Sequence, residues 1–351
     1  MKRKLIRAGA AFLAAALLLT GCAGKKAPVS GGAQAASSGE PETVNIGTQQ
    51  MPNDERIAIV KGCFQKELGV KVKIMEFQAG DIRNAMIAKN IDFALLGSSS
   101  AVLGIANGMD AEVIWIHEVL GDAEQLVARN GSGIHSIRDL KGKKVATAFT
   151  STSHYSLLQA LKMNGVSEKD VTLLDMQMPD IYAAWQNGTI DAAYAWEPTL
   201  SKLLQSGHSL LSSKDLAEKK MATYNVEIVR KEFAQKYPDL VAKYIRALND
   251  AVELYRKHPD EAMEAVASNL NISKAEAQKQ MEGSTWLDTK EQLSSSYLGT
   301  SAHKGAAAAS FADMADFLYE QKSLRSKPSS STFERAVNPS YAEKALQSTA
   351  G

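Results

Sequence analysis

Two hydroxyl-rich turns carry the residue types that could bind a small anion. Gly97-Ser98-Ser99-Ser100 stands between a predicted strand and the predicted helix 101–106, and Thr150-Ser151-Thr152-Ser153 precedes the predicted helix 154–161. One Ser or Thr at each helix start would serve as an ordinary N-cap. Longer hydroxyl runs exceed that need, and the free N–H groups of a helix N-terminus attract anions. The pattern predicts an anion site if the two turns face each other across a cleft.

A second candidate is the sequence Trp196-Glu197-Pro198, at the end of another predicted strand. Open α/β sheets place ligand-binding residues at such strand ends. An aromatic ring beside a carboxylate suits a cationic amine, through cation–π attraction and charge pairing. Packing of Trp196 between lobes, with Glu197 exposed to solvent, explains the same residues equally well, so the spacing leaves both interpretations open.

Other chemistries lack their motifs. The six His residues are scattered without metal-ligand spacing, and the chain contains no glycine-rich phosphate loop. Ser151, Ser153 and His154 are neighbours, but no Gly-x-Ser-x-Gly elbow surrounds them. We therefore expect no catalytic residues, no metal and no cofactor.

The elements that would position the candidate residues alternate between strands and helices. Strands are predicted over 44–46, 70–77 and 91–96, and helices over 57–68 and 82–89. This alternation predicts an α/β fold with mostly parallel sheets.

A similar series of elements recurs later in the chain. A strand over 171–176 and a helix from Pro179 lead to Ile190-Asp191-Ala192-Ala193, which resembles Ile91-Asp92-Phe93-Ala94. This weak repeat predicts two lobes of similar construction, and 351 residues also exceed what one hydrophobic core usually serves. From Asp239 onward the chain is predicted to be helical, with an apolar stripe in the core formed by Leu240, Tyr244, Leu248, Ala251 and Tyr255.

The chain begins with an export signal. Basic residues within 1–7 precede an apolar run over 8–19 that is too short to span a bilayer comfortably, which predicts a signal peptide over 1–21. Leu19-Thr20-Gly21-Cys22 resembles the bacterial lipobox, in which the Cys is acylated and anchors the protein to a membrane. An ordinary secretory signal with a chance Cys is the alternative. Residues 22–41 are then a flexible tether, and Cys63 is predicted to be a buried, inert thiol.

Net charge excludes one class of partner. The chain has 40 Lys and Arg against 39 Asp and Glu, a formal charge of +1, so no polyanionic partner such as nucleic acid is expected. Four of the basic residues precede Cys22, which leaves 36 basic against 39 acidic residues, a formal −3, in the exported part. Anion capture must therefore come from local donors.

Several segments resemble a known family, the periplasmic substrate-binding proteins of taurine, sulfonate and nitrate ABC importers, and the taurine binders most closely. The segments that carry the resemblance are 149–162 (FTSTSHYSLLQALK), 183–198 (AAWQNGTIDAAYAWEP), 96–99 (LGSS) and 229–233 (VRKEF). The resemblance covers the chain from about Val44 to its C-terminal region.

The family implies a two-lobed periplasmic-binding-protein fold of type II, with two hinge crossings and a helical C-terminal part. The crossings are expected near 128–131 and 227–230. Lobe 1 would then hold 42–128 plus 229–351, and lobe 2 would hold 129–228. Ligand binding would close the cleft, and the closed, monomeric protein would deliver its ligand to a membrane permease at the cell envelope, in the periplasm or on the outer face of the cytoplasmic membrane.

The resemblance also implies a set of ligand-binding residues. A sulfonate has three acceptor oxygens, which hydroxyl and N–H groups of both turns could satisfy, with the other end of the ligand at the aromatic and acidic residues. The expected contacts are Gln49, Ser98, Ser99, Thr150, Ser151, Thr152, Tyr155, Trp196, Glu197 and Asn225, with Trp286 as a further wall candidate.

One position departs from the family pattern. Where a taurine binder is expected to have an acid just before the second hinge strand, this chain has Asn225. If that acid pairs with the taurine amine, Asn225 weakens the charge balance. The acids that could compensate are Glu118, Asp122, Glu124 and Glu197. A sulfonate without an amine, nitrate or a thiamine-precursor pyrimidine are the alternative ligands. A pyrimidine-synthase enzyme is the alternative from another class, and its Cys-rich motif is missing.

Overall fold

The computed structural model describes residues 39–348. The predicted signal peptide, Cys22 and the tether as far as residue 38 lie outside the described residues. Within the described part, no helix has the length and apolar content needed to cross a membrane.

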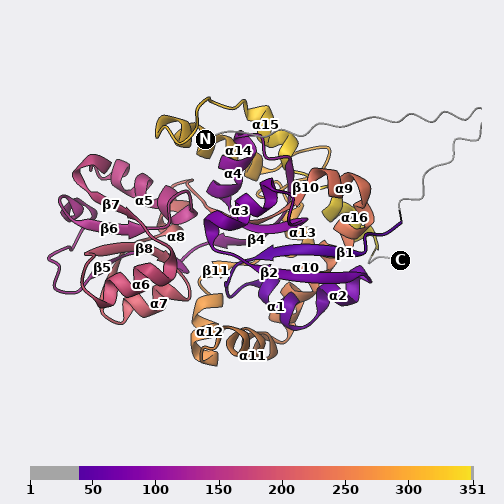
Figure 1. The fold of residues 1–351 in the computed structure, drawn as a ribbon, viewed down its shortest axis with the longest axis horizontal. Coiled ribbons are helices and arrows are strands. Elements are labelled where there is room, and N and C mark those ends of the chain that lie inside the picture. The colour runs from indigo at the N-terminus through magenta and orange to yellow at the C-terminus, as the bar shows by residue number, and fades with distance from the viewer. Residues whose placement is uncertain (1–38, 349–351) are drawn as a thin grey trace, which may run out of the picture. The chain divides into compact units, whose positions relative to one another are not determined.

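Two mixed sheets form the framework (Figure 1). The first has the strand order β11-β4-β10-β3-β1-β2, and the second has the order β7-β6-β8-β5-β9. The first sheet consists of β1 Thr43–Thr48, β2 Lys71–Glu76, β3 Phe93–Gly97, β4 Ala111–Leu120, β10 Tyr224–Arg230 and β11 Ser284–Thr285. The second consists of β5 Glu124–Arg129, β6 Lys144–Thr147, β7 Thr172–Asp175, β8 Ala192–Trp196 and β9 Gly207–Ser212. The predicted α/β class is confirmed.

Strand direction in each sheet follows from where the chain enters it. β1 pairs in parallel with β2 and β3, and β6 pairs in parallel with β7 and β8, as predicted. β10 runs antiparallel to β3 and β4, and β5 runs antiparallel to β8 and β9. β5 and β10 each begin where the chain arrives from the other sheet, so they start at the edge where their parallel neighbours end. The prediction of mostly parallel sheets therefore holds for only part of each sheet.

The chain passes between the sheets earlier than the sequence suggested. The expected boundaries at 128/129 and 228/229 fall inside β5 and β10, which are fully paired within the second and first sheet respectively. The passages lie at 121–123 and 218–223 instead. A Cβ on Gly121 would lie 2.7 Å from the carbonyl oxygen of Gly283, so the first passage packs directly against the segment before β11. We propose these two passages as the lobe boundaries.

Helices cover both sheets (Figure 1). Those of the second sheet are α5 Thr152–Met163, α6 Met178–Gln186, α7 Thr199–Leu204 and α8 Ser213–Ala217. Those of the first are α1 Asp54–Val60, α2 Cys63–Leu68, α3 Ala79–Ile87, α4 Ser98–Ala106, α9 Lys231–Lys236, α10 Pro238–Lys257, α11 Pro259–Leu270, α12 Lys274–Met281, α13 Thr289–Gln292, α14 Ala306–Glu320, α15 Ser330–Ala336 and α16 Ser340–Ser348. The single helix predicted over 57–68 is split, because Gly62 takes a left-handed conformation (φ 69°) between α1 and α2.

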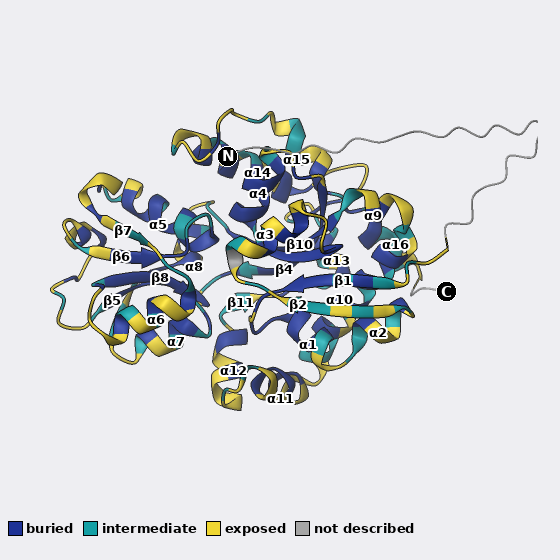
Figure 2. Cartoon of the chain, viewed as in Figure 1, coloured by how far each residue is buried: buried dark blue, intermediate teal, exposed yellow. Residues whose placement is uncertain are grey.

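The predicted stripe on α10 packs into the core on one side of the first sheet (Figure 2). Leu240, Tyr244, Leu248 and Ala251 are buried there, and Tyr255 is partly buried beside them. Tyr244 stacks on Phe64 and Phe93 with ring centroids 4.6 and 4.0 Å apart, which joins α10 to α2 and β3.

A buried cluster of ionisable groups ties α1 to β4 and β10. The His117 ring lies 2.7 Å from Asp54 Oδ1 and 2.9 Å from Glu227 Oε2, and all three side chains are fully buried. Burial alone would lower the pKa of His117, but the charges and hydrogen bonds of Asp54 and Glu227 raise it well above its usual value. Burial and repulsion by Glu227 raise the pKa of the neighbouring Glu55 to about 8. The cluster is thus a charged imidazolium between two acids, with a protonated Glu55 alongside.

The raised pKa of Glu55 should make the stability of the fold depend on pH. Folded protein holds this proton from the ordinary carboxyl range up to about pH 8, whereas the unfolded chain releases it near 4.5. The free energy of unfolding therefore falls as pH rises through this window, by up to about 1.4 kcal/mol per pH unit for one proton. Glu55→Gln should reduce this slope, as measured by urea unfolding between pH 5 and 8, and the part due to the raised pKa of His117 should remain above about pH 6.5. Glu261→Gln, an exposed control, should retain it. Parallel pH curves for wild type and Glu55→Gln would contradict the assignment.

Candidate functional site

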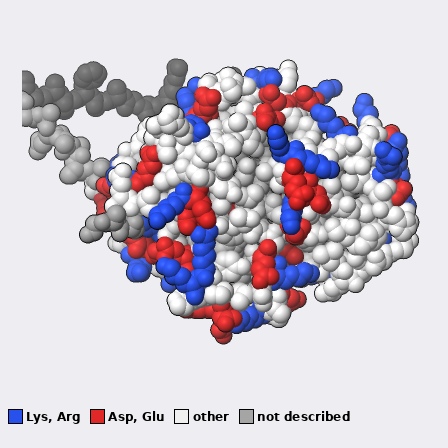
Figure 3. Space-filling view, turned by 180° about the vertical axis from the view of Figure 1, so that it is seen from behind, with Lys and Arg blue, Asp and Glu red and all other residues white. Residues whose placement is uncertain are grey.

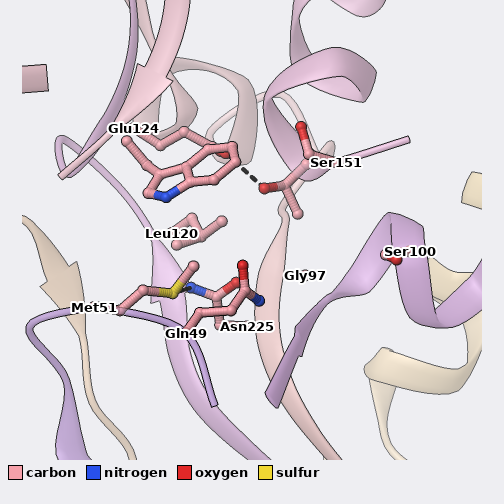
Figure 4. Close-up of a pocket in the computed structure, with 10 residues that line it drawn as sticks. Gln49, Met51, Gly97, Ser100, Leu120, Glu124, Ser151 and Asn225 are labelled. Carbon is pink, nitrogen blue, oxygen red and sulfur yellow. Dashed lines mark hydrogen bonds between the residues drawn. The ribbon is translucent and has the colours of Figure 1, made fainter. Parts of the chain in front are cut away.

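A pocket lies where strand ends of the two sheets meet (Figure 4). The first sheet and its connections contribute Gln49, Met51, Gly97, Ser100, Leu120 and Asn225, and the second contributes Glu124, Ser151, Thr152 and Trp196. Gln49 and Trp196 also line a wider groove with Glu76, Asp81 and Lys202, so they stand at the entrance.

Two helices begin at this pocket. α4 follows Gly97, and α5 follows Ser151, whose hydroxyl accepts the His154 N–H (3.2 Å) and donates to the Ala148 carbonyl (2.6 Å). A Cβ on Gly97 would lie 3.1 Å from Thr152 Cγ2, so the absence of that atom allows the two helix starts to approach closely. The predicted meeting of the two hydroxyl-rich turns is therefore present, and the first-turn N–H groups of both helices lie beside the pocket.

Thr150 forms the contact between the two turns. It has a left-handed backbone (φ 65°), which is strained for a β-branched residue. The Ser99 hydroxyl donates to the Thr150 carbonyl (3.0 Å), and Arg83 Nη1 donates to Thr150 Oγ1 and to Ser100 Oγ (3.3 Å each). The described residues place no carboxylate within ion-pair distance of Arg83, so its guanidinium is a positive charge without a protein counter-charge, behind the lining residue Ser100.

Glu124 is the fully buried acid of the pocket. Its carboxylate accepts hydrogen bonds from the hydroxyls of Thr152 (2.5 Å), Ser153 (2.7 Å) and Ser213 (2.6 Å). Burial raises the pKa of Glu124, and the three hydroxyl donors oppose this increase. No basic side chain of the described region forms an ion pair with it.

Two amide side chains form the floor of the pocket on the first sheet. Asn225 Nδ2 donates to Glu118 Oε1 (2.8 Å) and contacts Met51 Sδ (3.5 Å; Figure 4). Gln49 Nε2 donates to the Leu95 carbonyl (3.1 Å). The Asn225 nitrogen has two protein acceptors, so its amide oxygen remains for a ligand. Gln49 uses one of its two N–H groups for Leu95, so it can offer a ligand a second N–H donor as well as its oxygen.

Half of the residues predicted from the sequence line the pocket. These are Gln49, Ser151, Thr152, Trp196 and Asn225. Of the acids proposed to compensate for Asn225, Glu124 lines the pocket and Glu118 bonds to Asn225 from behind.

The other predicted contacts lie outside the pocket. Ser98 Oγ accepts the Tyr224 N–H, and Ser99 and Thr150 bond to each other across the two turns. Tyr155 packs edge-on against Phe317 in the core. The last two are turned away into other contacts: the Glu197 carboxylate accepts the N–H and hydroxyl of Ser201, and Trp286 packs against Tyr255.

Several residues of the site were missed by sequence reasoning. Arg83 lies in a helix with no motif around it, and Met51 and Leu120 have no chemical signature. Glu124 was named only as one of four acids that could compensate for Asn225, and Gly97 and Ser100 only as part of a hydroxyl-rich turn.

On the face shown in Figure 3, basic and acidic side chains are interspersed. Over the described residues, no group of three or more His, Cys, Asp or Glu side chains is arranged to hold a metal ion. The pocket therefore relies on the local groups described above.

Comparison with known proteins gives consistent matches. The model of the NMT1/THI5-like family matches residues 56–262. The taurine-binding periplasmic protein of Escherichia coli (strain K12) is 31% identical over 285 residues, 79% of this chain and 86% of that protein. The alkanesulfonate-binding protein SsuA of Xanthomonas axonopodis pv. citri, solved with MOPS, matches with a TM-score of 0.70 at 21% identity, over 82% of this chain and 96% of that one.

A second solved structure, the periplasmic aliphatic sulphonate binding protein SsuA of Escherichia coli, matches with a TM-score of 0.69 at 22% identity, over 85% of this chain and 92% of that one. These similarities confirm the two-lobed periplasmic-binding-protein fold.

We expect Glu124→Ala and Glu124→Gln to affect the stability of the fold differently. Glu124→Ala leaves three buried hydroxyls without their acceptor, and the free energy of unfolding should fall by about 1–3 kcal/mol. Glu124→Gln keeps an oxygen acceptor and removes a buried charge without a counter-charge, so the Tm should stay equal or rise. Thermal unfolding without ligand measures both. A larger loss for Gln than for Ala would show that the carboxylate charge itself holds the fold.

Proposed function

The chain belongs to the NMT1/THI5-like family, and on that basis we propose that it is the substrate-binding lipoprotein of an ABC importer that captures taurine or a similar alkanesulfonate. The ligand would occupy the pocket between the two sheets, and closure of the lobes would present it to a membrane permease. The proposal draws on the relatives, whose names specify taurine and aliphatic sulfonates.

One observation carries the proposal: the starts of α4 and α5 meet at the pocket, and Arg83, which has no ion-pair partner among the described residues, donates to the lining residue Ser100 from behind. A sulfonate is ionised at any physiological pH and offers three acceptor oxygens. First-turn N–H groups, the Ser100 hydroxyl and the helix dipoles suit such an anion. The sequence suggested neutral donors alone, whereas the structure adds a guanidinium, which strengthens anion binding in a partly buried site.

Catalysis is not part of the proposal. The Ser151 hydroxyl bonds to backbone groups, and the His154 ring accepts the Thr150 N–H (3.3 Å) while stacking on Phe149. Burial lowers the pKa of His154 to about 4. A serine nucleophile needs a base within hydrogen-bond reach of its hydroxyl, and this pair lacks that geometry.

Ligand binding gives the direct test. Taurine at millimolar concentration should raise the Tm of the purified protein, because a ligand that binds only the folded state stabilises it. Calorimetry should show weaker binding for Arg83→Gln, by about tenfold for one lost charged hydrogen bond, and weaker binding for the Ser151→Ala, Thr152→Ala double variant. No shift with taurine or ethanesulfonate, together with a clear shift for nitrate, would reject the sulfonate class.

The Ser151→Ala, Thr152→Ala variant needs a control, because Ser151 caps α5 and its replacement also lowers the stability of the helix. Ser273 caps α12 with a capping box outside the pocket. Ser273→Ala should lower Tm by a similar amount and leave taurine affinity unchanged. If both Ala variants weaken binding equally, the effect of Ser151 is structural and not a ligand contact.

Membrane anchoring is a separate prediction for the proposed lipoprotein. Cys22→Ser removes the thiol that acylation requires, so the protein should move from the membrane fraction to the soluble fraction of cells. Cys63→Ser, which changes the other Cys, should leave the distribution unchanged. Membrane association of the Cys22→Ser protein would refute a lipid anchor at this position.

A further inference from the structure

We propose that Glu55 is a positioning residue of the binding site: as a neutral carboxylic acid it orders, through Thr48, the segment 48–51 that brings Gln49 and Met51 to the pocket. This inference rests on the proposed function and deepens it, because it makes the affinity for a sulfonate depend on one buried proton. Glu55 acts from behind the lining residues and does not touch the ligand.

The first argument is the charge balance around Glu55, whose residue is only 1% exposed. Two further carboxylates, those of Asp54 and Glu227, already flank the His117 ring at 2.7 and 2.9 Å. If Glu55 is ionised, one imidazolium has to balance three buried acids. A second uncompensated negative charge in the protein interior is costly, so the neutral form of Glu55 fits the cluster better.

The titratable groups that face Glu55 come from each element packed around it. They are Asp54 and Arg56 on α1, His117 on β4, Glu227 on β10 and Tyr244 on α10. Arg56 is buried too, but its guanidinium bonds to Glu76 Oε1 (2.8 Å) and to the Gln49 carbonyl (2.6 Å). Burial and repulsion by Glu227 outweigh the attraction of His117 and Arg56, and they raise the pKa of Glu55 to about 8.

Hydrogen-bond geometry links this proton to the pocket segment. The Thr48 hydroxyl lies 2.5 Å from Glu55 Oε2 and 3.3 Å from the Gln49 carbonyl oxygen, and it has one proton to donate. When Glu55 is neutral, its O–H donates to Thr48, and Thr48 donates to the Gln49 carbonyl. When Glu55 is ionised, its carboxylate can only accept. The Thr48 proton then turns to Glu55, and the bond to Gln49 is lost.

The segment ordered by this chain of bonds reaches the pocket. Gln49 and Met51 line it, and the Gln49 carbonyl also accepts the Met51 N–H (2.9 Å), which closes the turn between them. Ionisation of Glu55 would remove one bond from this turn. It would also add a negative charge behind the pocket, where the low dielectric constant of the interior screens repulsion of a sulfonate poorly. Both effects weaken anion binding, so affinity should fall as pH rises through about 8.

Taurine affinity, measured by calorimetry on the purified protein between pH 6 and 9, tests the inference. Glu55→Gln keeps a neutral side chain whose N–H can donate to Thr48, so at pH 6 it should bind taurine as wild type does. At pH 9 wild type should bind about threefold or more weakly than Glu55→Gln, the loss expected for one hydrogen bond. The taurine amine titrates alike with both proteins, so the ratio of the two affinities isolates Glu55.

Glu112→Gln is the matched control. Glu112 is another buried acid, and it accepts hydrogen bonds from the Tyr341 hydroxyl (3.0 Å) and the Asn338 amide (3.1 Å). It lies near the start of β4, at the opposite end of that strand from the pocket residue Leu120. Glu112→Gln should keep the wild-type fall in affinity toward pH 9. If it removes that fall as Glu55→Gln does, the effect is not specific to Glu55.

Thr48 gives a second readout. Thr48→Val keeps the branched shape and removes the hydroxyl, so it should weaken taurine binding at pH 6 and reduce the fall in affinity toward pH 9. Thr48→Ser returns the hydroxyl and should restore both properties. A merely structural role of Thr48 would lower the Tm and leave the pH profile of affinity as in wild type.

The outcomes separate this inference from the proposed function. A wild-type pH profile parallel to that of Glu55→Gln would overturn the positioning role and leave sulfonate binding intact. Failure of wild type to bind any sulfonate between pH 6 and 9 would overturn the proposed function itself.

Wild type also provides a test that requires no substitution. A ligand that favours neutral Glu55 must raise the affinity of Glu55 for its proton, since the coupling is reciprocal. Binding of taurine at pH 8 should therefore take up protons in excess of the share due to the titration of taurine itself, as measured by calorimetry in buffers of different ionisation enthalpy. Absence of this excess would contradict the inference even if no variant folds.

Discussion

The imidazolium of His117, held between Asp54 and Glu227, is the interaction on which the pocket floor depends. It joins the start of α1 to the middle of β4 and β10, and Asp54 also accepts the Trp115 N–H (2.8 Å). Removing one partner from such a buried cluster leaves an uncompensated charge, so the cluster strongly favours this packing of α1 against β4 and β10. Gln49 and Met51 precede α1, and Asn225 begins β10, so the cluster sets where these side chains lie.

Antiparallel strands bring chemistry from both sheets to one place. β1, β3, β6 and β8 end at the pocket, while β5 and β10 begin there because the chain has just passed from the other sheet. Glu124 is the first residue of β5, and Asn225 is the second residue of β10. Each passage therefore places one of these side chains beside the helices α4 and α5, which begin at the same edge of the sheets. The two groups of acceptors and the two helix N-termini share a pocket for this topological reason.

Most of the hydroxyls in the two turns serve the fold. Ser151 caps α5, Ser99 bonds to Thr150 across the turns, and Thr152 and Ser153 bond to Glu124. The charged groups differ from these hydroxyls, because Arg83 and Glu124 have no ion-pair partner among the described residues. Strain at Thr150 and a buried carboxylate both cost stability, and such costs are retained where a ligand offsets them.

The sequence by itself determined the α/β class, the helical C-terminal core and the two hydroxyl-rich helix starts, because these follow from local periodicity and capping preferences. It also identified Gln49, Ser151, Thr152, Trp196 and Asn225 as pocket residues, since a family motif records position along the chain. Tertiary structure alone decided that Ser98, Ser99, Thr150, Tyr155 and Glu197 turn to protein partners, that Glu124 lines the pocket, and that Arg83 bonds to Ser100 behind it. Side-chain partners of a buried charge come from distant segments, as when Ser213 reaches Glu124, and no local pattern encodes them.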